Sequence, residues 1–449
     1  MYRQRRFVAV IVIFAIICTV GLFLPGSLQT DIKDPNLNFA DIAWMLTAAG
    51  LVLLMTPGLS FFYGGMVSKK NIISTMLQSF IALGVMTVLW VTVGFSLSFG
   101  TSIHGLIGNP FDFAFFRNVD LHSSAALAPS IPLMLFAVFQ MKFAIITPAL
   151  ITGSFAERVK FNAYLVFIIL FSVFIYCPLA HWTWHPDGFL HKWGVLDFAG
   201  GTVVHMSAGY AALAGAMFLG PRTGFSDNKH SDPANIPYVI LGSGMLWFGW
   251  FGFNSGSALG ANTTAVVAFT TTVVASAAAM MSWIFFDAAR GKKVSAMGAC
   301  IGAVVGLVAI TPACGYVNVP QALFIGFISA IISNLAVRAK NRSSLDDTLD
   351  VFPCHGIGGI VGMIMTGVFA KDVGLFYGHT TTFLYHMLAL AIVSIYSFGG
   401  SYLLYIITDK IVPLRVSAED EHEGLDFTQH GERYKIKKPE DDPSVLKLF

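Results

Sequence analysis

Two histidines lie inside long apolar runs of this 449-residue chain. His205 follows Asp197 in the string DFAGGTVVH, and His355 follows Asp350 in the string DVFPCH. An ionisable group inside a membrane costs about 2.5–3.5 kcal/mol to insert, so each one is a candidate for function. A single buried histidine is more often a satisfied core residue, but histidine also titrates near neutral pH. Two histidines in comparable places therefore favour a pair that lines a path and exchanges a proton.

The two aspartates have a structural interpretation. An aspartate at a helix start accepts hydrogen bonds from free backbone N–H groups and suits the positive end of the helix dipole. We therefore expect Asp197 and Asp350 to cap or brace their helices rather than to bind a solute directly. No carboxylate falls in the middle of an apolar run. A path through these runs would offer no fixed counter-charge to a bare metal cation.

Aromatic residues form a second group. Phe139 and Phe143 are four residues apart, and Trp250, Phe253 and Ser257 follow the spacing of one helix face. Such a stripe is more often packing than function. The direction in which each run would cross a membrane nevertheless predicts depth. Phe139 and Ser257 are expected nearer the outer side, with Phe143 and Phe253 about one helical turn deeper.

Trp184 ends another apolar run on the outer side, so Phe139, Trp184 and Ser257 are expected to form an outer ring. Aromatic faces and a hydroxyl attract a small cation without a formal charge. A constriction of phenylalanines below the ring would strip water from whatever enters. A suitable solute is a small cation that can give up its proton beside neutral histidines. Ammonium meets this condition, whereas sodium and potassium do not.

The runs that position these residues are long enough to cross a bilayer. The chain is 55% hydrophobic and 12% charged, with a mean hydropathy of +0.70. A membrane span of about 30 Å needs about 20 apolar residues. Such runs follow the N-terminal segment near residues 41–66, 72–99, 131–156, 161–184, 197–220, 236–259, 263–288, 295–312, 319–338, 352–370 and 383–408. The composition therefore predicts one polytopic membrane body.

Lysine and arginine are divided unequally between alternate loops, and the basic side of a membrane protein is cytoplasmic. One set of loops carries Lys69, Lys70, Arg158, Lys160, Arg222, Lys229, Arg290, Lys292, Lys293, Arg338, Lys340 and Arg342, and the other carries Arg117, Lys192 and Lys371. We therefore expect a multi-pass protein of the bacterial inner membrane, with residues 28–408 as its membrane domain and a cytoplasmic tail at 409–449.

Residues 1–27 have the character of a signal peptide, because the basic string MYRQRR precedes an apolar stretch. Removal of this segment would leave eleven spans, and its retention would make twelve; removal is favoured. The fold class expected is all-α, with eleven transmembrane helices arranged as two inverted five-helix repeats plus a final helix. Asp197 at an outer end and Asp350 at an inner end agree with this symmetry.

Five strings then carry a resemblance: FAERVKF, DFAGGTVVH, WFGWFGFNSGSA, TPACGY and DVFPCHGIGGIVG. In this order the chain resembles the ammonium transporter (Amt/Mep/Rh) family from about residue 40 to 434. The resemblance implies a homotrimer with one pore in each subunit. It implies an outer recruitment site of Phe139, Trp184 and Ser257 with Asp197, a gate of Phe143 and Phe253, and a pore lined by His205, His355 and Trp250.

The tail resembles the family's cytoplasmic C-terminus, which implies a PII-type signalling protein as a partner. From Val412 to Tyr434 it is polar but holds apolar residues at intervals. We expect these residues to anchor it on basic loops, with Leu414, Leu425 and Phe427 as anchors, Glu419, Asp420, Glu421 and Glu423 as charged partners, and Arg158, Arg290 and Arg338 as the loop residues.

Three other functions stay open. An ammonium sensor acting through a cytoplasmic partner is the main alternative, although a receptor is expected to carry an output domain and this tail is short. A channel for neutral gas is disfavoured by the cation site at Trp184 and Ser257. An enzyme is least favoured, because the chain shows no nucleophile–base–carboxylate set and no CxxC pair. No metal, cofactor or nucleic acid is expected. Lys142 is expected to face away from the path, and His386 to lie at an interface.

Overall fold

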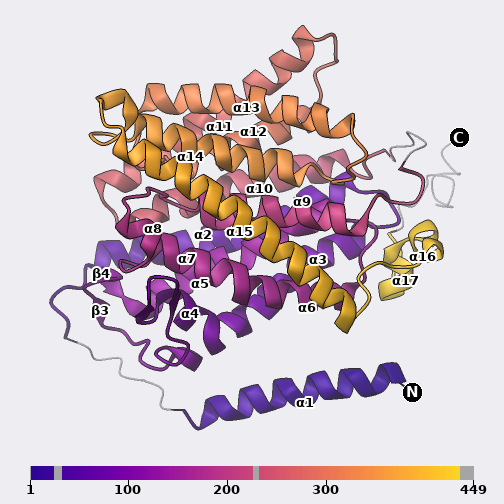
Figure 1. Cartoon of the computed structure of the whole chain (residues 1–449), viewed down its shortest axis with the longest axis horizontal. Coiled ribbons are helices and arrows are strands. Elements are labelled where there is room, and N and C mark those ends of the chain that lie inside the picture. The colour runs from indigo at the N-terminus through magenta and orange to yellow at the C-terminus, as the bar shows by residue number, and fades with distance from the viewer. Residues whose placement is uncertain (1, 25–32, 226–231, 435–449) are drawn as a thin grey trace, which may run out of the picture.

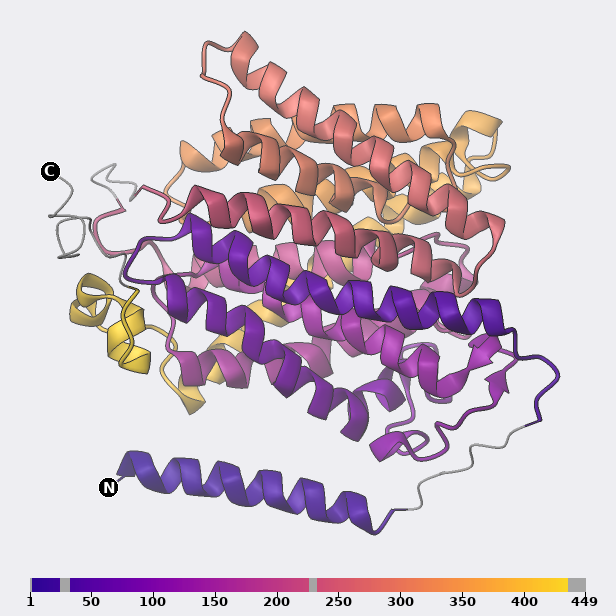
Figure 2. The same ribbon diagram turned by 180° about the vertical axis from the view of Figure 1, so that it is seen from behind.

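The structure is a computed structural model that describes residues 2–24, 33–225 and 232–434. The long helices lie side by side along one common direction (Figure 1), and the view from behind shows the same bundle (Figure 2). The last part of the predicted tail, 435–449, and part of the predicted signal peptide, 25–27, lie outside the described residues.

Ten helical segments of the described chain are long and apolar enough to cross a membrane. They consist of α2 (Phe39–Met66); α3 (Ile72–Leu89) with η1 (Trp90–Gly94) and α4 (Phe95–Phe99); α5 (Leu133–Ile151) with η3 (Thr152–Ser154); α6 (Phe161–Phe171) with η4 (Ser172–Tyr176), α7 (Cys177–Trp184) and α8 (Phe189–Lys192); η5 (Gly201–Met206) with α9 (Ser207–Leu219); α10 (Ile236–Ser255) with η7 (Gly256–Ala258); α11 (Thr263–Ala289); α13 (Val319–Asn341); η8 (Phe352–Gly356) with α14 (Ile357–Phe369); and α15 (Thr381–Ile411). These elements confirm the polytopic helical class.

The eighth apolar run folds into α12 (Ala296–Ile310), which has 15 residues and is shorter than the ten segments above. The hydroxyl of Ser295 caps it by accepting a hydrogen bond from Gly298 N (3.0 Å). At 1.5 Å per residue, α12 is about 22 Å long, which is less than the hydrocarbon thickness of about 30 Å. It packs against α10, α11 and α13, and most of its side chains are buried.

Helices α2 and α10 approach closely because glycine lies between them. A Cβ atom on Gly242 would lie 2.3 Å from the backbone nitrogen of Phe62. Small residues of this kind let membrane helices pack backbone to backbone. Replacement of Gly242 by alanine would therefore push α2 and α10 apart.

The two ends of the bundle differ. One end carries two short antiparallel hairpins, β1 (Ser102–Ile103) with β2 (Ile107–Gly108) and β3 (Ser123–Ser124) with β4 (Ala128–Pro132), and the 3₁₀ turns η2 (Ala114–Phe116) and η9 (Leu375–Tyr377). The other end carries the tail helices α16 (Ala418–Glu423) and α17 (Leu425–His430), as Figure 1 shows. The hairpin end holds Arg117 and corresponds to the side poor in basic residues.

The N-terminal helix α1 (Tyr2–Leu22) lies beside the bundle in both views (Figures 1 and 2). Apolar side chains such as Ile11, Phe14 and Leu22 are exposed along it. An exposed apolar helix fits either a segment that is removed or a helix that faces lipid. The signal peptide therefore stays a prediction.

The tail packs on the end of the bundle opposite the hairpins through two of its predicted anchors. Leu414 and Leu425 are buried, whereas Phe427 is 42% exposed. Leu425 N donates to Asn71 Oδ1 (2.8 Å). Lys70 Nζ donates to the carbonyls of Glu421 (2.7 Å) and His422 (2.6 Å).

The loops that receive the tail are only partly those expected. Lys160 N donates to Leu414 O (2.8 Å), and Val416 N donates to Arg158 O (3.1 Å). Within the described chain, no hydrogen bond or ion pair joins the tail to Arg290 or Arg338, so packing against those two loops stays a prediction. The charged residues of the tail pair mostly within it, as Glu421 with Arg415 (2.8 Å) and Glu423 with Arg433 (3.2 Å). Charge alone did not show which basic loop lies beneath the tail.

Candidate functional site

Two π-helical turns bring the histidines together in the middle of the bundle. His205 lies in η5 and His355 lies in η8, and both side chains are buried. Their Nδ1 atoms are 3.3 Å apart, and their rings stack at 5.4 Å with an angle of 26°. One nitrogen must donate and the other accept, because a neutral imidazole carries one N–H. His205 Nε2 has no hydrogen-bond partner among the described residues.

A small cavity adjoins the histidine pair. Its walls include His205, His355, Trp250 and Phe253, and apolar side chains of α2, α5, α10 and α12 complete them. Its volume is about 10 Å³, which is close to the least that holds one water molecule. Trp250 lies flat on His205, with ring centroids 5.4 Å apart and an angle of 19°. The indole N–H of Trp250 donates to the hydroxyl of Thr311 (2.9 Å), which fixes the plane of the ring.

Two phenylalanines stack beside the cavity. Phe143 of α5 and Phe253 of α10 lie 4.2 Å apart with an angle of 28° between their rings. Both side chains are buried. Phe253 lines the cavity and lies 6.1 Å from the ring of His205. The stacked pair therefore adjoins the histidines through Phe253.

The predicted outer ring surrounds Phe143 on its other side. Phe139 lies 5.0 Å from the ring of Phe143, and Trp184 lies 5.7 Å from it at 84°. Phe139 packs on Gly256, since a Cβ there would lie 2.9 Å from its ring, and Ser257 is the next residue. The hydroxyl of Ser257 donates to Phe253 O (2.8 Å), which leaves the lone pairs of the oxygen free to accept.

Asp197 is engaged entirely by its own helix start. Its Oδ1 accepts from Gly200 N (2.8 Å) and Gly201 N (2.6 Å), and its Oδ2 accepts from the backbone N–H (2.7 Å) and hydroxyl (2.5 Å) of Thr202. The carboxylate therefore caps η5, which carries His205. Its backbone carbonyl accepts the indole N–H of Trp184 (3.1 Å). Asp197 thus connects the outer ring to the histidine pair without facing the path.

Comparison with known proteins agrees with this arrangement. The sequence model of the Ammonium Transporter Family matches residues 43–435. An ammonium transporter of Aquifex aeolicus (strain VF5) is 44% identical over 408 residues, which cover 89% of this chain and 94% of the relative. The chain belongs to the ammonium transporter family.

Solved structures of this family share the fold. Mep2 of Saccharomyces cerevisiae is similar with a TM-score of 0.82 and 34% identity, over 88% of this chain and 91% of that one. A structure described as a sensor Amt protein is similar with a TM-score of 0.81 and 31% identity, over 87% of this chain and 98% of that one. The structure described as Mep2 and the one described as a sensor Amt protein are therefore both similar in fold to this chain.

In this member of the ammonium transporter family, the counterpart of Asp197 is Asp347 and not Asp350. Asp347 accepts hydrogen bonds from Val351 N (3.1 Å) and Phe352 N (2.8 Å) at the start of η8. It precedes His355 by the same eight residues that separate Asp197 from His205. Asp350 has a positive φ of 57° and pairs with Lys340 (2.7 Å). This equal spacing of aspartate and histidine is visible in the sequence. The comparison of DFAGGTVVH with DVFPCH overlooked it, because the second string begins at Asp350.

Two further cavities lie between the histidines and the end of the bundle that carries the tail. The first of these shares Phe62, Val304 and His355 with the histidine cavity. It also shares Met66 and Leu349 with a wider cleft of about 280 Å³. Lys70, Arg222 and Glu157 line that cleft, and Glu421 and His422 of the tail form part of its wall. The tail of this ammonium transporter family member therefore borders the wider cleft.

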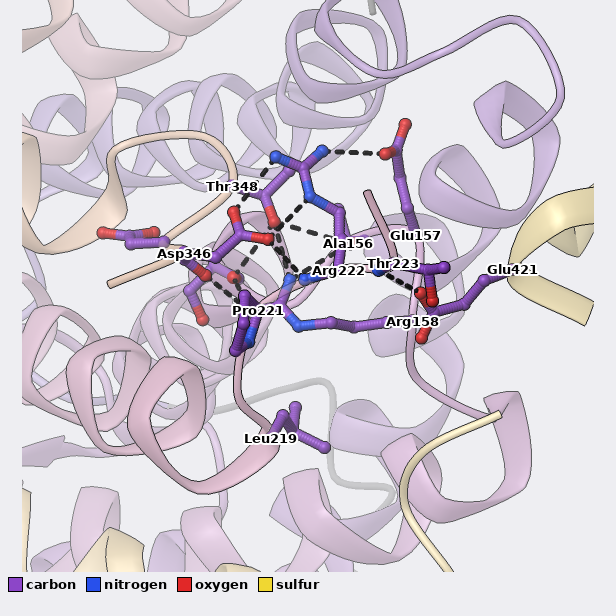
Figure 3. A network of polar contacts seen from close by, with 12 residues as sticks. Ala156, Glu157, Arg158, Leu219, Pro221, Arg222, Thr223, Asp346, Thr348 and Glu421 are labelled. Carbon is purple, nitrogen blue, oxygen red and sulfur yellow. Dashed lines mark hydrogen bonds and ion pairs between the residues drawn. The ribbon is translucent and has the colours of Figure 1, made fainter. Parts of the chain in front are cut away.

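The buried Arg158 and the partly exposed Arg222 hold the residues beside Asp347, and Figure 3 shows their contacts with Asp346 and Thr348. Arg222 bonds Asp346 through Nε (2.8 Å) and Nη2 (3.0 Å), and it bonds Glu157 through Nη1 (2.8 Å). Arg158 donates to Thr348 Oγ1 (2.7 Å) and to the carbonyl of Asp346 (2.5 Å). These contacts fix the residues on both sides of Asp347. Sequence reasoning used both arginines for the topology and Arg158 also as a loop residue beneath the tail, but it did not foresee that they hold Asp346 and Thr348.

Burial and pairing set the charge states of this network. Burial would raise the pKa of Glu157, but the Arg222 guanidinium and the N–H of Ser68 hold it below its usual value. Burial lowers the pKa of Arg158 to about 10. Burial also raises the pKa of Asp347 to about 6, and the nearby Asp350 carboxylate adds to this effect. The network therefore contains stable ion pairs and one carboxylate that titrates near neutral pH.

Three further ionisable residues lie in the bundle outside the histidine cavity. Lys142 is partly buried on α5, and no carboxylate of the described chain pairs with it. His386 is fully buried and hydrogen-bonded on both ring nitrogens, so its expected place at an interface is wrong. His181 was missed: it lies buried in α7, where Nδ1 contacts Ser98 O (3.0 Å) and Nε2 contacts Ser102 Oγ (2.8 Å). Its sequence signal was an ionisable side chain within an apolar run.

Proposed function

We propose that this chain transports ammonium across a membrane through the path described above. The observation that carries the proposal is the Nδ1–Nδ1 contact of 3.3 Å between His205 and His355 beneath the stacked phenylalanines. A cation that kept its charge would meet no carboxylate in this apolar cavity, and an unpaired charge is costly there. A solute that leaves its proton on a histidine avoids this cost.

The entry step uses the outer ring. Trp184 offers an aromatic face and Ser257 a hydroxyl oxygen, and cation–π contacts of this kind contribute about 0.5–2 kcal/mol. Phe143 and Phe253 then exclude the water that surrounds the cation. The proposal includes the recruitment site predicted from the sequence, which consists of Phe139, Trp184, Ser257 and Asp197.

The proton step uses the histidine pair. Ammonium gives one proton to His205 Nε2 and continues as ammonia. The hydrogen on His205 Nδ1 moves to His355 Nδ1, and the hydrogen on His355 Nε2 leaves toward the inner cleft. Each histidine gains and loses one proton, so the pair ends neutral. This step requires the tautomer in which His205 carries its hydrogen on Nδ1 and His355 on Nε2.

The finer topology belongs to the same proposal. We infer eleven spans with α12 counted as one, arranged as two inverted five-helix repeats and a final helix. The equal spacing of Asp197–His205 and Asp347–His355 supports the repeats. We also infer a homotrimer in a bacterial inner membrane, with a removed signal peptide, a cytoplasmic tail and a PII-type partner at the inner cleft. Curated relatives named as ammonium transporters favour transport over sensing.

Ammonium-evoked currents test the proposal. Proteoliposomes on a solid-supported membrane receive a jump of ammonium or of potassium, for the wild type and for His205→Ala and His355→Ala. We expect a current with ammonium alone, and a changed rate or selectivity in both variants without loss of assembly. Unchanged current and unchanged discrimination against potassium in both variants would refute the role of the pair.

A further inference from the structure

A histidine outside the path holds the segment that precedes Asp197. His386 of α15 is completely buried. Its Nε2 accepts a hydrogen bond from Leu196 N (3.0 Å), and its Nδ1 contacts the carbonyl of Met363 on α14 (2.9 Å). A carbonyl only accepts and a backbone N–H only donates, so Nδ1 carries the hydrogen and Nε2 is bare. The partners therefore fix a neutral ring in one tautomer.

The two bonds of His386 join the helices that carry the path histidines. Leu196 directly precedes Asp197, whose carboxylate caps η5 and whose carbonyl accepts the Trp184 indole. Met363 lies on α14, which continues from the turn that carries His355. Gly367 allows the close fit, because a Cβ there would lie 3.2 Å from His386 Cβ. His386 thus fixes the backbone on which the outer ring depends.

At the end of the bundle that carries the tail, the residue before a capping aspartate is also held by side chains from other elements. Asp346 directly precedes the capping residue Asp347, and the side chains of Arg222 and Arg158 hold it. In both halves, a buried nitrogen-bearing side chain from another element anchors the residue before the capping aspartate. If His386 only filled space, there would be no reason for the residue before both capping aspartates to be anchored in this way.

We propose that His386 is a positioning residue for the outer site: it holds Leu196 and Asp197 so that Trp184 faces the entering cation. This inference rests on the proposed ammonium transport. The Leu196 bond should matter for the half-saturating ammonium concentration and much less for the maximal rate, which depends on the histidine pair. The Met363 bond should matter for neither.

Two variants separate the bonds. In His386→Gln the amide oxygen takes the place of Nε2 and keeps the Leu196 bond, whereas in His386→Asn the amide nitrogen takes the place of Nδ1 and keeps only the Met363 bond. His386→Leu keeps neither. One hydrogen bond corresponds to about a three- to tenfold change in an equilibrium constant. We expect His386→Asn and His386→Leu to raise the half-saturating concentration by this factor, and His386→Gln to stay within about twofold of wild type.

Hydrogen–deuterium exchange of the peptide from Leu196 to Met206 gives a second measurement that needs no transport. Exchange should accelerate in His386→Asn and His386→Leu and stay as in wild type in His386→Gln. Equal half-saturating concentrations for the Gln and Asn variants would overturn the inference, as would a raised concentration without faster exchange. If the wild type carries no ammonium current, the proposed function fails. Independently of transport, unchanged hydrogen–deuterium exchange in all three variants would show that His386 does not hold the segment at Leu196 and Asp197.

Discussion

Arg222→Met should destabilise this protein far more than the loss of an exposed ion pair with the same geometry. Arg222 is 19% exposed, and its partners Glu157 and Asp346 are 10% and 1% exposed. Methionine leaves both carboxylates buried without their cation, which costs about 3–5 kcal/mol of unfolding free energy. Lys192 and Asp187 also lie 2.8 Å apart, but they are 59% and 58% exposed. Lys192→Met should cost only about 0–1 kcal/mol.

Thermal unfolding in detergent, followed by tryptophan fluorescence, compares the two variants. An unfolding entropy of about 2.1 cal/mol/K per residue gives about 0.9 kcal/mol/K for a chain of this length. The Tm of Arg222→Met should therefore fall by about 3–5 °C, and that of Lys192→Met by about 1 °C or less. Adding Glu157→Gln to Arg222→Met should recover part of the loss, because one unpaired carboxylate is then neutral. Equal shifts for the two single variants, or no recovery in the double variant, would refute the reasoning.

Three further predictions concern the outer ring, the inner cap and the tail. Trp184→Leu removes the aromatic face and should raise the half-saturating ammonium concentration several-fold, and an unchanged concentration dependence would contradict the recruitment site. The raised pKa of Asp347, about 6 against 3.8, means that its contribution to stability is complete below about pH 4 and is lost as the pH rises through 6. The Tm of Asp347→Asn relative to wild type should therefore increase from about pH 5 to about pH 7.5, by the equivalent of about 1–2 kcal/mol, whereas a constant difference would argue against the assignment. A chain that ends at Ile411 should no longer retain a PII-type protein in a pull-down with ATP, ADP or 2-oxoglutarate, whereas the full chain should retain it. Equal retention by the two chains would exclude the tail as the docking element.

The sequence predicts helices well here because apolar length is a direct signal. The run expected at 72–99 coincides with α3, η1 and α4, which end at Phe99. The run expected at 197–220 begins as helix only at Gly201, because the residues from Asp197 to Gly200 form the cap. The run at 295–312 gives the shorter α12, since the chain turns after Ile310. Hydropathy indicates which segments are removed from water, but it does not indicate the residue at which a helix begins or ends.

The sequence predicts which residues belong to the site, but it does not predict which of them contact one another. Periodicity places Phe143 and Phe253 on helix faces, but their stacking depends on how α5 and α10 meet in space. Asp350 was expected to cap the helix that carries His355, but Asp347 is the cap, because capping depends on backbone geometry and Asp350 has a left-handed conformation. Hydrogen bonds such as that of His386 with Leu196 join residues far apart in the chain, and no local pattern announces them.

The bond between His205 and His355 joins like atoms, so the pair cannot be symmetric. One ring donates and the other accepts, which gives the pair two polarities. In the proposed mechanism, a proton that passes from His205 to His355 leaves the pair with the opposite polarity. A second proton can follow in the same direction only after the hydrogens have returned to their first arrangement. If the proposal holds, the time that this return takes sets an upper limit on the turnover rate.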